Sequence, residues 1–599
     1  MQRILFFFLA LIGYSSLFAT YAYELSWENP ASRSYVVSMT AEISNGKFTE
    51  FSVPLWRPGR YITQDYASAV SAFQAFDEKN QPLEWKKTDK DSWLVKNPSS
   101  GKITVQYKVY AGIQDAGSSY LCLEYAYFNP SNFFMFCSDR LEEPCSLFVK
   151  SMPKDWTVAS ALKKTAEHNR FWADTYHDFI DSPTILSGSL HSFERKINDT
   201  RYYFHFQGEY EGGTAAENAY LDGVSKIISK QVELFTEAPM QEYHFIYLLL
   251  PFNMRHAVEH SFSSCYALPL ESMKNAASVK SMFAVTSHEF WHLWNVKRIR
   301  PAALWPYRYD KEQYTALHWF TEGVTDYYAD LILVRAGLID TAGFFASLEE
   351  NISSMENSYA TQIISPEQSS FDSWLSPSNY ADPHLKTSYY PLGFRVGMLL
   401  DLGIRKQTAG KKSLDDVMRY LYQEYYKKGM GVPEAGVRAA VELISSSDWN
   451  TFFQDHVAGV KPISYSEYFD AFGLELKTEK LAEKPVWENL GIARIEKIEY
   501  GLYVSSVIPG SDAENAGIGD RDILLSVNEK PAAGESALEE IRQLKKGKEI
   551  EIAIFSNGIR RTVKLKYTTS INPLDYSLEI KSNQNAAQKK MLEDWLGGK

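Results

Sequence analysis

The sequence is poor in cysteine, in excess positive charge and in long apolar runs. It has four cysteines among 599 residues and no CxxC pair, which argues against a structural zinc cluster. A net charge of −12 argues against nucleic acid as a partner. Beyond the N-terminus no stretch is long and apolar enough to cross a bilayer, and no internal repeat is present.

The N-terminus carries the one segment with the features of a secretory signal. Arg3 precedes an apolar run, and Ala19 or Ala22 could end a cleavage site, so residues 1–22 are interpreted as a signal peptide. An uncleaved anchor is the alternative. The sequence thus predicts an exported, periplasmic or secreted protein with no stable membrane span after cleavage. Cys122, Cys137, Cys145 and Cys265 suit an oxidising compartment; they could pair in three full connectivities or remain buried thiols.

A 45% hydrophobic content rich in aromatic residues indicates a globular chain, and its length predicts three or four domains. Its central motif is His288-Glu289-Phe290-Trp291-His292 in the run SHEFWHLWNVKRIRP. If this segment is helical, residues four apart share a face, so His288 and His292 can reach one metal ion. Glu289 lies beside them, where it can deprotonate a metal-activated water.

The following segment supplies the third ligand. Asp310 to Gln313 has the pattern of a capping box, which predicts a helix from Asp310 that ends at Gly337. Glu322 lies on it about thirty residues after His292 and completes a two-histidine, one-glutamate zinc site. Asp326, four residues on, could hydrogen-bond a ligand imidazole. The alternative is that Glu322 and Asp326 form a solvated face, as we expect for His318.

HEFWHLWNVKRIRP followed by HWFTEGVTDYY resembles the glycyl aminopeptidase family of gluzincin metallopeptidases, whose members carry a C-terminal PDZ domain. The resemblance extends over nearly the whole mature chain. It implies one Zn²⁺ per chain, held by His288, His292 and Glu322, with Glu289 as general base. It also implies cleavage after small N-terminal residues such as Gly or Ala.

Two further site residues come from this resemblance. In related one-zinc aminopeptidases an edge strand carries a glutamate that binds the substrate's α-amine, and the family pattern Gly-Gly-Leu-Glu-His corresponds here to HAVEH, with Glu259 in that place. The glycines are missing, so a side chain at His256 is expected to narrow or re-aim the first subsite. A Tyr-x-x-Gly pattern corresponds to YPLG and makes Tyr390 the oxyanion donor, with Tyr389 as rival.

The predicted fold is multidomain α+β. The boundaries are listed in order: signal peptide 1–22, N-terminal β-sandwich-like domain 23–197, thermolysin-like catalytic domain with a helical half 198–473, linker 474–485, PDZ domain 486–568, and tail helix 569–599. The N-terminal segment LWRPGRY matches a tryptophan–proline–glycine segment of the family and is expected to pack against the catalytic domain. In the PDZ domain, Leu490, Gly491 and Ile492 would form the loop that captures a peptide carboxylate.

The function predicted is that of a zinc aminopeptidase acting on peptides or proteins. The alternatives are a zinc endopeptidase whose polypeptide substrates dock on the PDZ domain, and a PDZ peptide-binding protein with a structural zinc. Hydrolysis of a non-peptide substrate also stays open. The sequence leaves undecided the physiological substrate, the oligomeric state and whether the PDZ groove binds a ligand.

Overall fold

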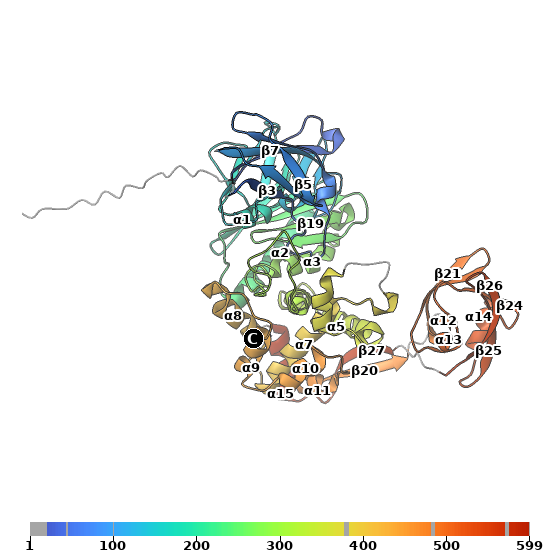
Figure 1. Cartoon of the computed structure of the whole chain (residues 1–599). Coiled ribbons are helices and arrows are strands. Elements are labelled where there is room, and N and C mark those ends of the chain that lie inside the picture. Colours follow the sequence, from blue (N-terminus) through green and yellow to red (C-terminus); the bar gives the residue numbers. More distant parts are fainter. Residues whose placement is uncertain are drawn as a thin grey trace, which may run out of the picture.

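The computed structural model describes residues 21–43, 46–99, 101–375, 382–480, 486–568 and 574–597. Figure 1 shows a β-rich unit, a larger helical unit next to it and a small third unit at the side, so the α+β, multidomain prediction is confirmed. The predicted signal peptide, except residues 21 and 22, lies outside the described residues. In the described ranges no helix combines the length and apolarity that a membrane span requires.

The N-terminal unit is a β domain, as predicted, and its described residues include one α-helix, α1 (Tyr176–Ile180). A seven-stranded sheet has the order β12-β13-β10-β1-β2-β7-β4, beside sheets ordered β11-β14-β9-β8 and β3-β6-β5. Alternate residues of β2 are buried, so one face of its sheet forms the core. Its strands are β1 (Tyr21–Ser26), β2 (Ser34–Glu42), β3 (Phe48–Ser52), β4 (Val70–Asp77), β5 (Trp85–Asp89), β6 (Ser92–Lys96), β7 (Lys102–Tyr110), β8 (Tyr120–Leu121), β9 (Tyr125–Phe128), β10 (Cys145–Val149), β11 (Thr157–Ser160), β12 (Lys163–Lys164), β13 (Arg170–Ala173) and β14 (Thr184–Ser187).

The catalytic unit begins with a five-stranded sheet in the order β15-β16-β17-β19-β18. These strands are β15 (His191–Ile197), β16 (Thr200–Gln207), β17 (Glu242–Leu250), β18 (His256–Glu259) and β19 (Ser263–Pro269). β17 is apolar on both faces because it is covered on both. Tyr243, Phe245 and Tyr247 join the core of the catalytic helices, whereas Ile246 and Leu248 pack with residues of the N-terminal domain. β18 pairs only with β19 and is an edge strand.

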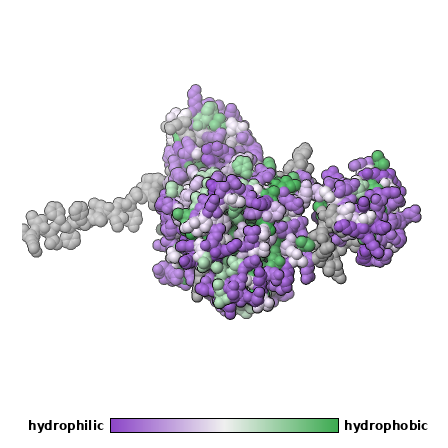
Figure 2. Space-filling view, turned by 90° about the horizontal axis from the view of Figure 1, so that it is seen from below, coloured by the Kyte–Doolittle hydropathy of each residue, from purple (hydrophilic) through white to green (hydrophobic). Residues whose placement is uncertain are grey.

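Helices make up the rest of the catalytic unit, which confirms the predicted helical half, and Figure 2 shows their outer surface as mostly hydrophilic. They are α2 (Gly213–Phe235), α3 (Phe283–Trp291), α4 (Val324–Arg335), α5 (Thr341–Glu356), α6 (Pro366–Phe371), α7 (Tyr389–Gln407), α8 (Leu414–Glu424), α9 (Gly436–Ser445), α10 (Asn450–His456) and α11 (Ser466–Phe469).

The predicted capping box at Asp310 is wrong. Residues 310–317 are not helical, and helix begins with a π-helical turn, Trp319–Gly323, that continues into α4. The side chain of Gln313 instead accepts from Arg308 N and donates to the backbone oxygens of Ala303 and Pro306. Gln313 therefore stabilises a loop. The residue pattern from Asp310 to Gln313 is the same for a loop of this kind and for a helix cap, so the sequence does not distinguish them.

The predicted linker is also wrong in part. Its first residues belong to β20 (Leu474–Lys480), which pairs with β27 (Leu574–Ile580), and the two strands lie side by side in Figure 1. Backbone pairing with a distant strand accounts for order in a segment whose charge alone suggested a linker. The third unit is thus inserted between two paired strands. After β27 the tail helix α15 (Ala586–Gly597) returns to the catalytic unit, where the buried Trp595 donates to the Tyr327 hydroxyl of α4.

The inserted unit is a compact strand-rich module with its own core. Its sheet has the order β21-β22-β23-β25-β26, with β24 paired to β23. Its elements are α12 (Val486–Asn489), β21 (Ile492–Ile498), β22 (Gly501–Val507), α13 (Asp512–Asn515), β23 (Ile523–Val527), β24 (Lys530–Pro531), α14 (Glu535–Arg542), β25 (Glu549–Ser556) and β26 (Ile559–Lys566).

The predicted carboxylate loop of this module, Leu490, Gly491 and Ile492, does not leave all its amides free. Leu490 N donates to Trp487 O, and Gly491 N donates to Glu488 O, so α12 already uses two of them. Gly491 has a φ of 93°, and a Cβ there would lie 2.0 Å from Ser511 Cβ, which explains the glycine. All four cysteines, which are within the described residues, are free and buried.

Candidate active site

The first part of the site is helix α3. Two apolar residues of the HExxH motif pack against neighbouring elements and hold this helix in place. Phe290 packs on rings of β16 and β17, at 5.9 Å from Tyr202 and 5.2 Å from Tyr243. Trp291 stacks on Tyr328 of α4 at 3.9 Å. The residues between the two histidines thus fix α3 against both the sheet and the helix that follows Glu322, and the polar residues of the motif face the opposite side.

Three electron-pair donors converge where α3 meets the π-helical turn. His292 Nε2 lies 2.9 Å from His288 Nε2 and 3.3 Å from Glu322 Oε2, and His288 Nε2 lies 3.7 Å from the same oxygen. Ligand atoms at zinc distances in a tetrahedron lie about 3.3–3.6 Å apart. The three side chains therefore have the spacing of a metal site, and the structure brings together the predicted set.

The outer ring nitrogens of both histidines are already committed. His292 Nδ1 donates to the Asn295 backbone oxygen at 2.7 Å, and His288 Nδ1 lies 2.7 Å from Asp326 Oδ1. A carbonyl and a carboxylate only accept, so both Nδ1 atoms carry a proton, and in the neutral imidazoles both Nε2 atoms present lone pairs. Lone pairs aimed at one another and at a buried carboxylate need a cation between them. The residues fit a metal ion, and Asp326 has the orienting position predicted for it.

A second group of possible ligands shares one residue with the first. Glu259, Glu289 and His292 also place donor atoms within 4.8 Å of one another. This group includes only one histidine, and both its carboxylates are buried. Glu322 belongs to the first group and not to the second, so a variant at Glu322 distinguishes them experimentally.

Glu289 is buried beside the metal group without being part of it. Its side chain is 6% exposed, and its Oε2 has no hydrogen-bond partner. Burial raises the pKa of Glu289 to about 7; the two histidines oppose this shift, and Glu259 and Glu322 reinforce it. A carboxylate with a free oxygen and a pKa near neutrality suits proton transfer at neutral pH.

Glu259 ends the edge strand β18, and the N-terminal domain packs against its carboxylate. A Cβ on Gly59 would lie 2.5 Å from Glu259 Oε2 and 2.6 Å from its Oε1, so a side chain there would displace this carboxylate, and the φ of 86° also favours glycine. The LWRPGRY segment therefore does more than pack between domains. It forms a wall of the site beside Glu259, a position that the sequence pattern alone did not reveal.

Tyr61, at the end of the same segment, adds to this wall. Its ring lies 3.9 Å from that of His318, and its buried hydroxyl has no hydrogen-bond partner. His318 is fully buried, so the expectation that it lies on a solvated face is wrong, and burial lowers its pKa to about 4. His318 is buried because the N-terminal domain covers this end of the helix, which cannot be inferred from a helical pattern.

The structure also corrects the expected role of His256. In a strand, alternate residues face opposite sides, so Ala257 shares the face of Glu259 and His256 does not. The His256 ring lies 3.6 Å from Asp115 of the N-terminal domain. The residue on β18 that could narrow a first subsite next to Glu259 is therefore Ala257.

Tyr390 stands at the start of α7, close to the metal group. Its ring stacks on His288 at 6.2 Å, whereas the Tyr389 ring faces His318 at 5.3 Å. The helix can approach this closely because Gly393 meets the π-helical turn: a Cβ on Gly393 would lie 1.9 Å from Trp319 O. Burial raises the pKa of Tyr390 well above its usual value, so the phenol stays neutral and able to donate.

A buried charge network explains part of the long motif after HExxH. Lys297 Nζ lies 3.0 Å from Asp181 Oδ1, which also accepts from His260 Nδ1 at 2.9 Å. Although burial alone would raise it, Lys297 and His260 hold the pKa of Asp181 below its usual range. The network joins the N-terminal domain, the residue after Glu259 and the segment after the metal helix, so it holds the walls of the site together.

We expect Asp181→Asn to lower the free energy of unfolding by about 3–5 kcal/mol, because it removes the nearest counter-charge of the buried Lys297. Since the folded pKa of Asp181 is depressed, its contribution is present above its unfolded pKa, near 4, and is lost as the pH falls. Urea unfolding at pH 7 measures the effect. An Asp181→Leu, Lys297→Met double variant, which removes both charges, should lose less. An unchanged midpoint for Asp181→Asn would contradict the role of the network.

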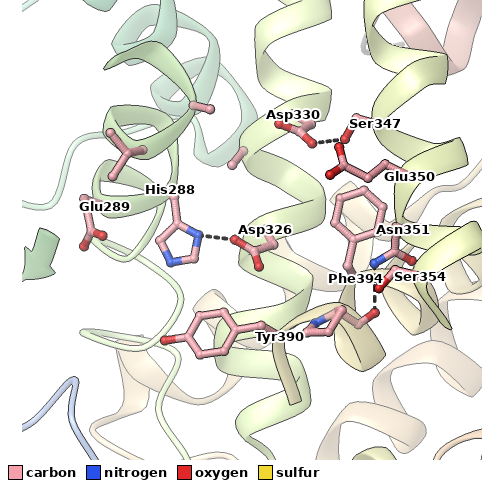
Figure 3. A pocket seen from close by; sticks show the side chains of 14 residues that line it. His288, Glu289, Asp326, Asp330, Ser347, Glu350, Asn351, Ser354, Tyr390 and Phe394 are labelled. Carbon is pink, nitrogen blue, oxygen red and sulfur yellow. Dashed lines mark hydrogen bonds and ion pairs between the residues drawn. The ribbon is translucent and has the colours of Figure 1, made fainter. Parts of the chain in front are cut away.

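A pocket of about 540 Å³ opens from the metal group between α3, α4, α5 and the start of α7. Figure 3 shows His288, Glu289, Asp326 and Tyr390 at one end and Asp330 and Glu350 at the other. Glu259 does not line it. The pocket therefore begins at the predicted catalytic residues and extends away from the edge strand.

Comparisons with known proteins agree with this site. A model of the peptidase M61 N-terminal domain matches residues 22–188, and a model of the M61 glycyl aminopeptidase matches residues 281–396. The crystal structure of an aminopeptidase N family protein from Idiomarina loihiensis superposes with a TM-score of 0.83 at 25% identity, covering 96% of this chain and 100% of that chain.

Curated relatives match only a short segment. A DegP-like periplasmic serine endoprotease from Buchnera aphidicola is 36% identical over 86 residues, 14% of this chain and 18% of its own length. A protein from Thermotoga maritima named as a zinc metalloprotease is 30% identical over 89 residues, 15% of this chain and 17% of its own. The chain thus spans less than a fifth of these relatives, and the DegP-like matches indicate a PDZ-like segment.

The fold and the group of two histidines and a glutamate define a zinc metallopeptidase. The chain belongs to the M61 glycyl aminopeptidase family.

Proposed function

We propose that this protein is an aminopeptidase that removes a small N-terminal residue, Gly or Ala, from peptides. The observation that supports this most strongly is Glu259, a buried carboxylate within 4.8 Å of His292 and Glu289, against which Gly59 packs. A carboxylate can bind the free α-amine of a peptide, and a wall directly behind it leaves no room for residues further upstream. Together they restrict cleavage to the first peptide bond.

Each remaining residue has a place in the reaction. Zinc, held by His288, His292 and Glu322, would polarise the scissile carbonyl and lower the pKa of a water molecule. Glu289 takes a proton from the attacking water and returns it to the leaving amine. The phenolic hydroxyl of Tyr390 donates a hydrogen bond to the oxygen on which negative charge develops. Asp326 holds His288 in the tautomer whose Nε2 faces the metal.

The free edge of β18 offers a way to align the substrate. An extended peptide can add a strand to an unpaired sheet edge through backbone hydrogen bonds. β18 ends at Glu259, so a peptide paired along it would bring its amine to that carboxylate. The first residue's side chain would then meet the surface formed by Ala257, Tyr61 and Gly59, which favours small residues.

The test is a cleavage assay on zinc-loaded protein with free-amine and N-acetylated versions of the same peptides. We expect release of the first residue only, abolition by acetylation, and a loss of about 10²-fold or more in kcat/KM for Glu259→Ala, since a charged, buried contact made with every substrate is removed. Glu424→Gln, on the surface of α8, is the matched control. Internal cuts in acetylated peptides would instead identify an endopeptidase, and no cleavage of any peptide would favour the PDZ-like binding function.

The N-terminal signal pattern supports export, and we include a periplasmic or secreted location in the proposal. Fractionation of cells, with N-terminal sequencing of the mature protein, would test it. A protein that keeps residues 1–22 and sediments with membranes would instead be an anchored form.

A further inference from the structure

The pocket beyond the metal group has a charge pattern that the reaction itself does not require. Asp326 and Asp330 follow Glu322 at intervals of four, so all three carboxylates lie along one face of the helical segment that ends in α4. Glu322 reaches the metal group and Asp326 holds His288, but Asp330 lies one turn further, away from both. It accepts a hydrogen bond from Ser347 of α5.

The opposite wall of the pocket, formed by α5, also presents hydrogen-bond acceptors. Ser347, Glu350, Asn351 and Ser354 recur on α5 at helical spacing and all line the pocket. Asn351 donates to Pro391 O, but its Oδ1 has no hydrogen-bond partner. The two walls thus present carboxylates, hydroxyls and an amide oxygen, all of which can accept hydrogen bonds.

Among the described residues, no lysine or arginine balances this charge. None of the residues that line the pocket is a lysine or an arginine. No lysine or arginine forms an ion pair with Asp330 or Glu350 in the described part of the chain. Burial, together with Asp326 and Glu350, raises the pKa of Asp330 to about 6, although the hydrogen bond from Ser347 and the charge of His288 oppose this shift.

An independent observation connects the pocket to a ligand. At its inner end Glu289 is 6% exposed, lines the pocket and leaves Oε2 without a partner (Figure 3). A volume of about 540 Å³ is within the range of roughly 300–1,000 Å³ typical of ligand sites. The polar groups and the space therefore belong to one cavity that reaches the reacting bond.

The direction of the substrate follows from the proposed function, on which this inference rests. If Glu259 holds the α-amine, the first residue lies on the side of His292 and β18, and the chain crosses Glu289 and Tyr390 at the scissile bond. The second residue then lies on the side of His288. The pocket opens there, with Glu259 excluded from its lining.

We propose that the pocket between α4 and α5 binds the second residue of the substrate and selects a lysine or arginine side chain there. An ammonium or guanidinium group carries several donors and no acceptor, which matches walls that offer acceptors and negative charge. The aliphatic stem of either side chain can pack on Val285 and Phe394, which also line the pocket.

The test compares peptides that differ only in their second residue: lysine, arginine, norleucine or glutamate, each after an N-terminal alanine. For the wild-type protein we expect kcat/KM to be about tenfold higher with lysine or arginine than with norleucine, a ratio equivalent to 1.4 kcal/mol. The Asp330→Asn, Glu350→Gln double variant should bring this ratio close to one while cleaving the norleucine peptide at nearly the wild-type rate. The Glu233→Gln, Glu424→Gln double variant, which removes the same charge from surface helices, should leave the ratio unchanged.

Charge reversal provides a second test, in which the expected result is a gain of cleavage activity. Glu350→Lys should raise the cleavage of the glutamate peptide relative to the norleucine peptide. A lysine-to-norleucine ratio near one in the wild type, or a high ratio that persists in the double variant, would overturn the inference while leaving the aminopeptidase intact. Absence of cleavage with every peptide would instead overturn the proposed function.

Discussion

Glu289→Gln should retain one zinc per chain and lose about 10²–10⁴-fold in kcat, the range for removal of a general acid–base. The amide has nearly the shape of the carboxylate but cannot take a proton. Glu289 is not one of the three converging donors, so its neutralisation leaves His288, His292 and Glu322 in place. Metal analysis of the purified variant measures its zinc content, and steady-state kinetics measures its kcat.

Glu424→Gln serves as the matched control, because Glu424 is a surface glutamate paired with Lys428. It should have wild-type kinetics. A Glu289→Gln protein that keeps its activity would exclude Glu289 as the base. A variant that loses its zinc along with its activity would assign Glu289 to the metal instead, as in the second ligand group that contains Glu259 and His292.

Glu322→Gln should lose zinc during dialysis against a chelator under conditions in which the wild type retains it. The amide removes the negative charge that faces the two Nε2 atoms, so the lone pairs of His288 and His292 hold a cation more weakly. Because the ion contributes several kcal/mol of transition-state stabilisation, the dialysed variant should be less active on the order of 10³-fold or more.

Excess zinc distinguishes this variant from the previous one. We expect added zinc to restore part of the activity of Glu322→Gln and none of that of Glu289→Gln. Titration with zinc, followed by metal binding and by activity, gives both curves. Full zinc content in dialysed Glu322→Gln would show that the metal lies instead with Glu259, Glu289 and His292.

Local patterns predicted the metal group because its chemistry depends on spacing within a helix. His288 and His292 are four residues apart, and Glu322 and Asp326 repeat that interval, so a helical reading places them correctly without any knowledge of the fold. The start of the second helix was predicted wrongly at Asp310, since the pattern at Asp310 to Gln313 belongs to a loop here. A cap and a loop use the same side chains, and tertiary contacts decide between them.

The environment of several residues depended on contacts between domains. His318 has no feature that distinguishes it from a surface histidine, yet Tyr61 covers it. The charged segment after Leu474 has the composition of a linker, yet Leu474–Lys480 form a strand through backbone pairing with β27. Ala257, and not His256, shares the face of Glu259 on β18, and His256 lies against Asp115 of the N-terminal domain.

The sequence by itself predicted the helical half, the group of His288, His292 and Glu322 and the β-rich N-terminal domain, because each follows from residue spacing within one or two segments. Only the tertiary structure placed Gly59 against Glu259, joined Asp181 to Lys297 and His260, and set Asp330 opposite Glu350. Those contacts involve residues from different elements. Their geometry is set by how sheets and helices pack, which no local pattern records.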